Sequence, residues 1–159
     1  MLYFDSQSMM EILEIPPMSM LCSSHKVNFA GMMDHVRVRS RELYAASQQA
    51  GLEVTGPLYW IYQGADGNPD TFFQLQIAIP VTPGTPIPAP FSLLRTEPFR
   101  CVSVRHAGPW TLFPEIYGKL LTEIQAAGHR LSGQNRELYL YMDFNDDRNH
   151  LTEIQIGIR

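Results

Sequence analysis

The sequence predicts an α+β domain, on three observations. Segments with strand character alternate with two helical segments, the two halves have the same order of elements, and a proline-rich segment separates them. The chain has 159 residues, which suits one domain with its own hydrophobic core. We expect this domain at 9–159 and regard 1–8 as a lead-in, native or added for expression. The first half is expected at about 9–81, the linker at 82–90 and the second half at 91–159.

The first half has the pattern of a strand, a helix and two further strands. Pro16 and Pro17 interrupt the first strand, because proline cannot donate a hydrogen bond to a sheet. Gly51 follows a stretch with few β-branched residues, which predicts a helix that stops at the glycine. The final strand alternates apolar and polar residues. The predicted elements lie at 12–22, 30–50, 58–63 and 72–81.

The second half repeats this order, at 99–105, 110–127, 137–144 and 151–158. Its helix is the clearest element in the chain, because its apolar residues recur at helical spacing and form one face. These residues are Phe113, Ile116, Tyr117, Leu120, Leu121 and Ile124.

Aligning the halves pairs similar residues. His25 falls on His106, and the run FQLQIAI falls on TEIQIGI, which places Gln74 on Glu153. Tyr59 likewise falls on Tyr139. Units this short cannot bury their apolar faces alone. We therefore expect duplicated β-α-β-β halves with pseudo-two-fold symmetry, a curved antiparallel sheet, both helices on one side, and a cleft at the junction.

Composition narrows the possible partners. The net charge is −4 and no concentrated basic segment occurs, which argues against direct nucleic-acid binding. No apolar run reaches the ~20 residues of a membrane span. Cys22 and Cys101 lie far apart without metal-ligand spacing, so we expect a cytoplasmic protein with no metal and no cofactor. The oligomeric state stays open.

The last predicted strand holds the principal candidate for ligand binding. If Ile154 and the isoleucines in phase with it face a helix, Glu153, Gln155 and Gly157 share the opposite face. A carboxylate buried there resists ionisation unless a cation or hydrogen bonds compensate. This favours a cationic ligand beside Glu153, with Gln74 as its counterpart in the first half. The alternative is that Glu153 lies on a solvated sheet face.

Aromatic residues are the second group of candidates. Tyr59, Tyr139 and Tyr141 lie on corresponding strands, and aromatic faces attract cations. Trp110 opens the second helix and is a candidate for one end of the cleft. For each of them, ordinary core or cross-strand packing is the alternative.

With these residues laid out, the chain resembles the GyrI-like, or AraC-type effector-binding, family over about 10–159. The resemblance rests on VSVRHAGPW before the second helix, RELYLYMDF, and the terminal LTEIQIGI. It implies a pocket lined by aromatic residues, with a glutamate of the closing strand at its floor that attracts cationic, lipophilic molecules. Glu153 matches that glutamate. Members in transcription regulators carry a separate DNA-binding domain, and we expect none in this chain.

We therefore expect a stand-alone binder of a small, cationic and aromatic or amphipathic molecule, without catalytic residues. Two alternatives follow from the same resemblance. One is a hydrolase of reactive cyclopropane-bearing toxins, with Glu153 as general base or acid and Tyr139 or Tyr141 stabilising developing charge. The other is a protein-interaction module similar to gyrase inhibitors.

Overall fold

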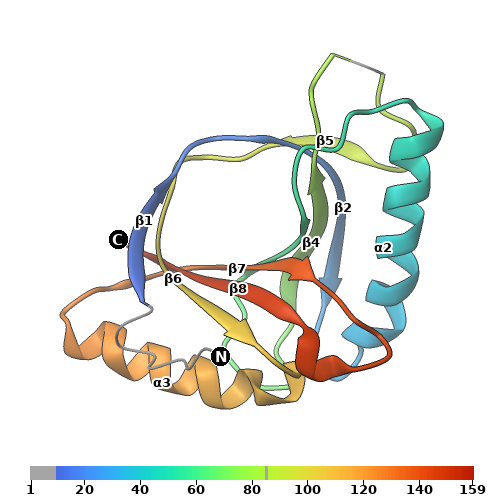
Figure 1. Cartoon of the computed structure of the whole chain (residues 1–159). Coiled ribbons are helices and arrows are strands. Elements are labelled where there is room, and N and C mark those ends of the chain that lie inside the picture. Colours follow the sequence, from blue (N-terminus) through green and yellow to red (C-terminus); the bar gives the residue numbers. More distant parts are fainter. Residues whose placement is uncertain (1–9, 85) are drawn as a thin grey trace. The chain divides into compact units, whose positions relative to one another are not determined.

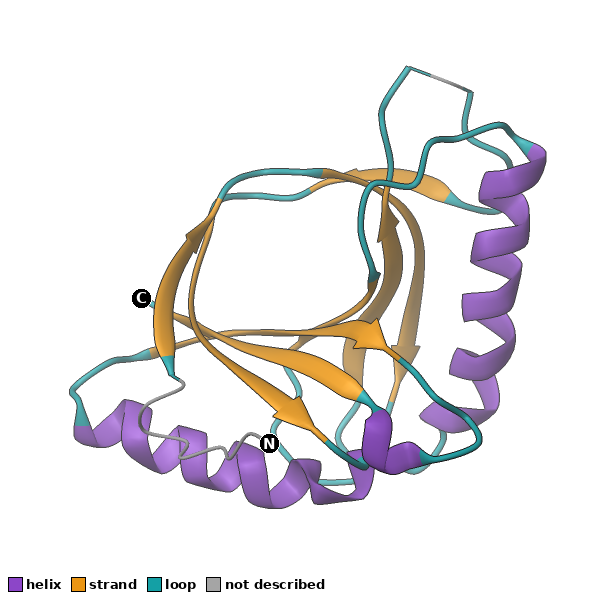
Figure 2. Cartoon of the chain, in the orientation of Figure 1, coloured by secondary structure: helices purple, strands orange, loops and turns teal. Residues whose placement is uncertain are grey.

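The computed structural model describes residues 10–84 and 86–159, and the segment predicted as a lead-in lies outside them. These residues form two compact units, which we describe one at a time. The α+β class is confirmed, with two α-helices, two short 3-10 helices and eight strands among the described residues (Figures 1 and 2).

Among the described residues, unit 1 comprises 10–15 together with Phe99–Arg159. Its antiparallel strands are ordered β1-β6-β8-β7. The elements are β1 (Glu11–Ile15), β6 (Phe99–Ala107), η1 (Trp110–Leu112), α3 (Phe113–Ala126), β7 (Leu131–Tyr141), η2 (Asp147–Asn149) and β8 (Leu151–Ile158).

The core of unit 1 lies between α3 and one face of β6 and β8. Leu120 and Ile124 of α3 are buried against valines of β6 and isoleucines of β8, and each such side chain contributes about 1.5–3 kcal/mol on burial. The rest of the predicted apolar stripe packs around them: Phe113, Ile116, Tyr117 and Leu121. The helical spacing in the sequence thus predicted the buried face of α3 correctly.

Unit 2 comprises Pro16–Pro98. Its strand order is β3-β4-β2-β5, also antiparallel, and α2 packs on β4 and β2 (Figure 1). The elements are β2 (Ser19–Val27), α2 (Met32–Gln49), β3 (Leu58–Gln63), β4 (Phe73–Pro80) and β5 (Ser92–Arg95).

The unit boundaries differ from the expected halves at both ends. The break at Pro16–Pro17 separates β1 from β2, and β1 pairs with β6 in unit 1. Conversely, β5 pairs with β2 in unit 2, although it follows the proline-rich linker. Each unit therefore consists of a β-α-β-β series with one extra strand. Descent from a duplication and a two-fold axis remain predictions.

The strand register corrects one expected equivalence. Gln74 lies opposite Lys26, whereas Glu153 lies opposite Arg105. When Gln74 is superposed on Glu153, Lys26 therefore corresponds to Arg105. His25 pairs with Leu75 but His106 with Thr152, so the two histidines are two residues out of register when Gln74 is superposed on Glu153.

Candidate functional site

The closing strand β8 has two buried faces. Every residue from Thr152 to Ile158 is buried, and Ile154, Ile156 and Ile158 pack toward α3 as predicted. Glu153, Gln155 and Gly157 therefore occupy the opposite face. The alternative that Glu153 lies on a solvated face is wrong, because it is only 7% exposed.

Glu153 is held by two neighbours. Arg105, directly opposite on β6, donates from Nε to Oε1 at 3.1 Å. Gln155 donates from Nε2 to Oε2 at 2.6 Å. The two ionic partners differ in exposure, since 58% of the Arg105 side chain is accessible but only 10% of the Glu153 side chain. The sequence analysis missed Arg105, because the pairing of β6 with β8 was needed to place it.

Gln155 is also buried, at 2% exposure. Its Oε1 accepts no hydrogen bond from any residue that the structure describes. Ser103 lies opposite Gln155 on β6 and Arg136 lies opposite it on β7. The Arg136 guanidinium lies 4.0 Å above the Phe99 ring, so this face also carries a second, buried cation.

Gly157 allows a close approach to the backbone, and the protein's own atoms make that approach. A Cβ at this position would lie 2.6 Å from the Gln134 carbonyl oxygen and 2.8 Å from the Phe99 ring, and it would also overlap the Ser132 hydroxyl. The space beside Gly157 is therefore filled by the protein and offers no room for a ligand.

Tyr139 and Trp110 do not lie with Glu153. Tyr139 pairs with Thr152, whose Oγ1 accepts a hydrogen bond from Trp110 Nε1 at 3.1 Å. Thr152 is adjacent to Glu153 in the strand, so these side chains lie on the α3 face of the sheet. Tyr139 OH donates to Glu137 at 2.6 Å, and Glu137 also accepts from Tyr117 OH. The expected grouping of these aromatics around Glu153 is therefore not formed.

Trp110 belongs instead to an aromatic cluster on the α3 face. It stacks on the ring of His150 at 4.2 Å and meets Tyr139 and Phe144 edge to face. Packing, the alternative interpretation, therefore describes Trp110 best.

Tyr141 has a different environment from Tyr139. A register shift between the two tyrosines places Tyr141 opposite Leu151, and its side chain is 57% exposed. Leu151 is in phase with Glu153 along β8. Tyr141 is therefore the one predicted tyrosine of unit 1 whose register position lies on the Glu153 face.

In unit 2, Tyr59 and Gln74 share a sheet face. Tyr59 pairs with Ala78, which is in phase with Gln74 along β4. Tyr59 is buried, whereas Gln74 is exposed. Gln74 lies between Lys26 and Gln63 of the neighbouring strands.

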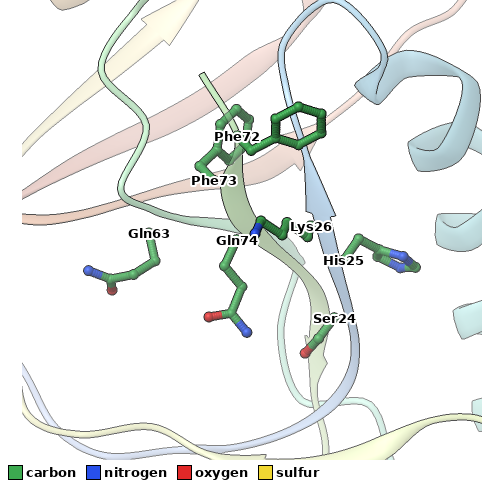
Figure 3. Close-up of a pocket in the computed structure, with 7 residues that line it drawn as sticks. All are labelled: Ser24, His25, Lys26, Gln63, Phe72, Phe73 and Gln74. Atoms are coloured by element: carbon green, nitrogen blue, oxygen red, sulfur yellow. The ribbon is translucent and has the colours of Figure 1, made fainter. Parts of the chain in front are cut away.

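An open hollow of about 550 Å³ in unit 2 is lined by residues that include Lys26, Gln63 and Gln74. Figure 3 shows Gln63 and Gln74 extending to one side of the strands and His25 to the other. No described carboxylate lies within ion-pair distance of Lys26. This hollow therefore offers amides and one ammonium group, without the acid found in unit 1.

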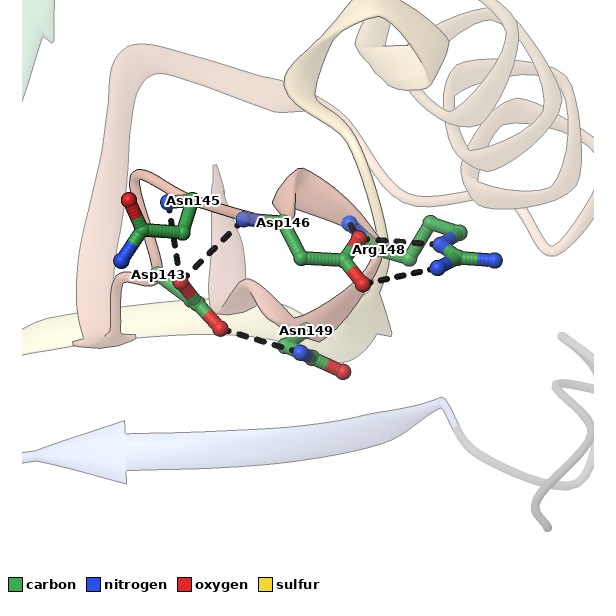
Figure 4. Close-up of polar contacts among 5 residues, drawn as sticks. All are labelled: Asp143, Asn145, Asp146, Arg148 and Asn149. Carbon is green, nitrogen blue, oxygen red and sulfur yellow. Dashed lines mark hydrogen bonds and ion pairs between the residues drawn. The ribbon is translucent and has the colours of Figure 1, made fainter.

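The acidic loop between β7 and β8 is closed by its own hydrogen bonds (Figure 4). Asp143 accepts from the backbone N–H groups of Asn145 and Asp146 and from Asn149 Nδ2. Asp146 accepts two hydrogen bonds from the Arg148 guanidinium. Hydrogen bonds, first to the Asn149 and Arg148 side chains and then to backbone N–H groups, lower the pKa of Asp143 and Asp146 below 3.8. The loop is a self-contained turn.

The chain thus consists of two antiparallel α+β units, and one of them has a buried acid on the sheet face away from its helix. A family model of the GyrI-like small molecule binding domain matches residues 8–159. The chain belongs to this family, and the resemblance inferred from the sequence is confirmed. No curated protein matches the chain.

Solved structures share the fold. The EcmrR C-terminal domain matches with a TM-score of 0.79 at 19% identity, covering 94% of this chain and 96% of that one. This chain spans 57% of EcmrR as seen in its DNA complex. A structure of SAV2435 bound to tetraphenylphosphonium has a TM-score of 0.65 at 12% identity, with 94% and 93% covered. A hydrolase encoded by lin2189 from Listeria innocua has a TM-score of 0.62 at 15% identity, with 95% and 92% covered.

None of the helices in the described residues is long and apolar enough to span a membrane.

Proposed function

We propose that this small-molecule binding domain takes a cationic, partly apolar ligand on the face of β6 and β8 that carries Glu153. The observation that supports this is the mismatch in exposure within one ion pair. The carboxylate is nearly buried, whereas the arginine that neutralises it is more than half accessible. Arg105 then acts as an exchangeable counter-ion.

The physical reason is the difference in solvation between the two partners. An exposed guanidinium regains most of its hydration when it moves away, so the loss of the ion pair is the main cost of displacing it. A buried carboxylate left without a partner is costly. A ligand cation that reaches Glu153 removes that cost, and the low local dielectric strengthens its attraction.

Neighbouring side chains supply apolar contact. Leu138 is buried opposite Glu153 on β7. Tyr141 is exposed, and a cation near its ring gains about 0.5–1 kcal/mol. The SAV2435 structure holds tetraphenylphosphonium, which is cationic and aromatic, and this supports the same ligand class here. We expect permissive binding with Kd in the micromolar range, which corresponds to a binding free energy of about −8 kcal/mol.

Calorimetric titration with tetraphenylphosphonium tests the proposal. Glu153→Gln should weaken binding at least about tenfold, because it removes the one charge that attracts the ligand. Glu14→Gln is the matched control, since Glu14 also pairs with a β6 arginine at 3.1 Å but is 74% exposed. Arg105→Gln should strengthen binding, because it removes the competing cation. Equal affinity of the wild type and Glu153→Gln would refute the proposal.

The hydrolase alternative loses one of its two candidate tyrosines. Tyr139 lies on the α3 face with its phenol bonded to Glu137, so it cannot stabilise charge beside Glu153. Tyr141 is the tyrosine left for that role. The hydrolase encoded by lin2189 shares only the fold at 15% identity, and no contact among the described residues favours catalysis over binding.

A further inference from the structure

The orientation of the Gln155 amide is fixed by its neighbour. Gln155 Nε2 lies 2.6 Å from Glu153 Oε2. Rotating the amide by half a turn would bring an oxygen against the carboxylate oxygen, with no hydrogen between them, and is excluded by repulsion. The amide oxygen must therefore be the atom that points away from Glu153.

That oxygen is a buried acceptor without a donor. Gln155 is 2% exposed, and no residue in the described part of the chain donates to its Oε1. A buried polar atom left unsatisfied costs about 1–3 kcal/mol. Buried acceptors are nearly always paired in native proteins, so this one marks a place where a donor is expected.

The charges on this sheet face favour a ligand that donates hydrogen bonds in addition to its positive charge. Glu153 faces Arg105 across the strands, and Arg136 lies opposite Gln155. One carboxylate is thus accompanied by two guanidinium groups. A ligand gains more here if it also donates hydrogen bonds, to Glu153 Oε1 in place of Arg105 and to Gln155 Oε1.

From this geometry, and on the basis of the function proposed above, we infer that the preferred ligand is a protonated amine or amidinium with at least two N–H groups. One N–H would replace Arg105 at Glu153 Oε1, and another would bond Gln155 Oε1. Quaternary ammonium and phosphonium ions have the same charge without a donor, so the inference separates two classes of lipophilic cation.

Matched ligands test this in the wild-type protein. The probes are 4-phenylbutylammonium, its N,N,N-trimethyl counterpart and the neutral 4-phenylbutanol, each titrated by calorimetry. The primary ammonium is the more strongly hydrated cation and costs more to desolvate. A site that attracts ligands only by charge would therefore bind the trimethyl compound more tightly. We expect the primary ammonium to bind about tenfold more tightly, as hydrogen bonds to a charged donor permit.

Variants assign the preference to Gln155. Gln155→Met is close in shape and lacks the amide, so the ratio of the two affinities should fall toward one. Gln76→Met is the control, because Gln76 is the aligned residue of β4 in unit 2 and should leave the ratio unchanged. Thermal unfolding of each variant verifies that it is folded.

The outcomes separate this inference from the proposed function. Equal or stronger binding of the trimethyl compound to the wild type overturns the inference, and so does a ratio that survives in folded Gln155→Met. In both cases weaker binding of both cations by Glu153→Gln would leave the proposed function standing. Binding of the neutral alcohol as tightly as both cations would overturn both.

Discussion

The Arg105–Glu153 pair should be coupled more strongly than the second cross-strand pair of unit 1. Both pairs join a β6 arginine to a glutamate, with Nε–Oε1 distances of 3.1 Å. They differ in the exposure of the glutamate, which is 10% for Glu153 and 74% for Glu14. The two pairs therefore compare the effect of burial at equal Nε–Oε1 distance.

The magnitudes follow from this difference. At 3.1 Å, two unit charges attract by about 1.3 kcal/mol in water and by roughly 5 kcal/mol at an effective dielectric of 20. Desolvation and side-chain entropy reduce both values. We expect coupling energies of about 2 kcal/mol for Arg105–Glu153 and at most about 0.5 kcal/mol for Arg100–Glu14.

Urea unfolding of two double-mutant cycles measures both couplings. Each cycle compares the wild type, Arg→Gln, Glu→Gln and the double variant at pH 7 and low salt, followed by circular dichroism. The coupling of Arg105 to Glu153 should also be less sensitive to 0.5 M salt, because buried charges are screened less. Equal coupling in the two cycles would refute the argument that burial of Glu153 sets the strength of the pair.

Three further predictions concern single positions. Gly157→Ala should lower the free energy of unfolding by about 2–3 kcal/mol, because its Cβ meets backbone and ring atoms. As a control, the Cβ of Gly118→Ala in α3 meets nothing, and this variant should raise the free energy of unfolding by about 0.5–1 kcal/mol in the same urea assay. A similar response of both variants would contradict this prediction. Burial is the main cause that raises the pKa of Cys101 from 9.0 to about 11. In a variant with no other cysteine, its thiol should react with a disulfide reagent at pH 8 about a hundredfold more slowly folded than unfolded, and comparable rates would argue against burial. The lowered pKa of Asp143 means that its contribution to stability is present above pH 3.8 and is lost as the pH falls through the lowered value; a carboxyl midpoint at or above 3.8 by NMR would contradict this.

Local patterns predicted what depends on neighbours in sequence. The apolar stripe of α3 and the alternation in β8 both follow from spacing, and both are confirmed. The break at Pro16–Pro17 follows from proline chemistry, although the sequence predicted an interruption within one strand and the structure has two separate strands. These features need no knowledge of which strands pair.

Features that depend on strand pairing were missed or misplaced. Arg105 is opposite Glu153 only because of the β6–β8 register, and β5 joins unit 2 only by pairing with β2. Tyr139 was expected in the ligand site because it is one of the aromatic residues on the corresponding strands. The structure pairs Tyr139 with Thr152 on the other face and shifts register before Tyr141. A one-residue change of register moves a side chain across the sheet, and composition cannot detect it.

The same register gives the two units different chemistry at corresponding positions. Unit 1 has Arg105 opposite Glu153, and unit 2 has Lys26 opposite Gln74. Gln74 is exposed, whereas Glu153 is buried. A carboxylate at position 74 would be solvated and worth at most about 0.5 kcal/mol to its lysine. An acid becomes useful for attracting a ligand only where burial makes its charge costly, and of these two positions only 153 meets that condition.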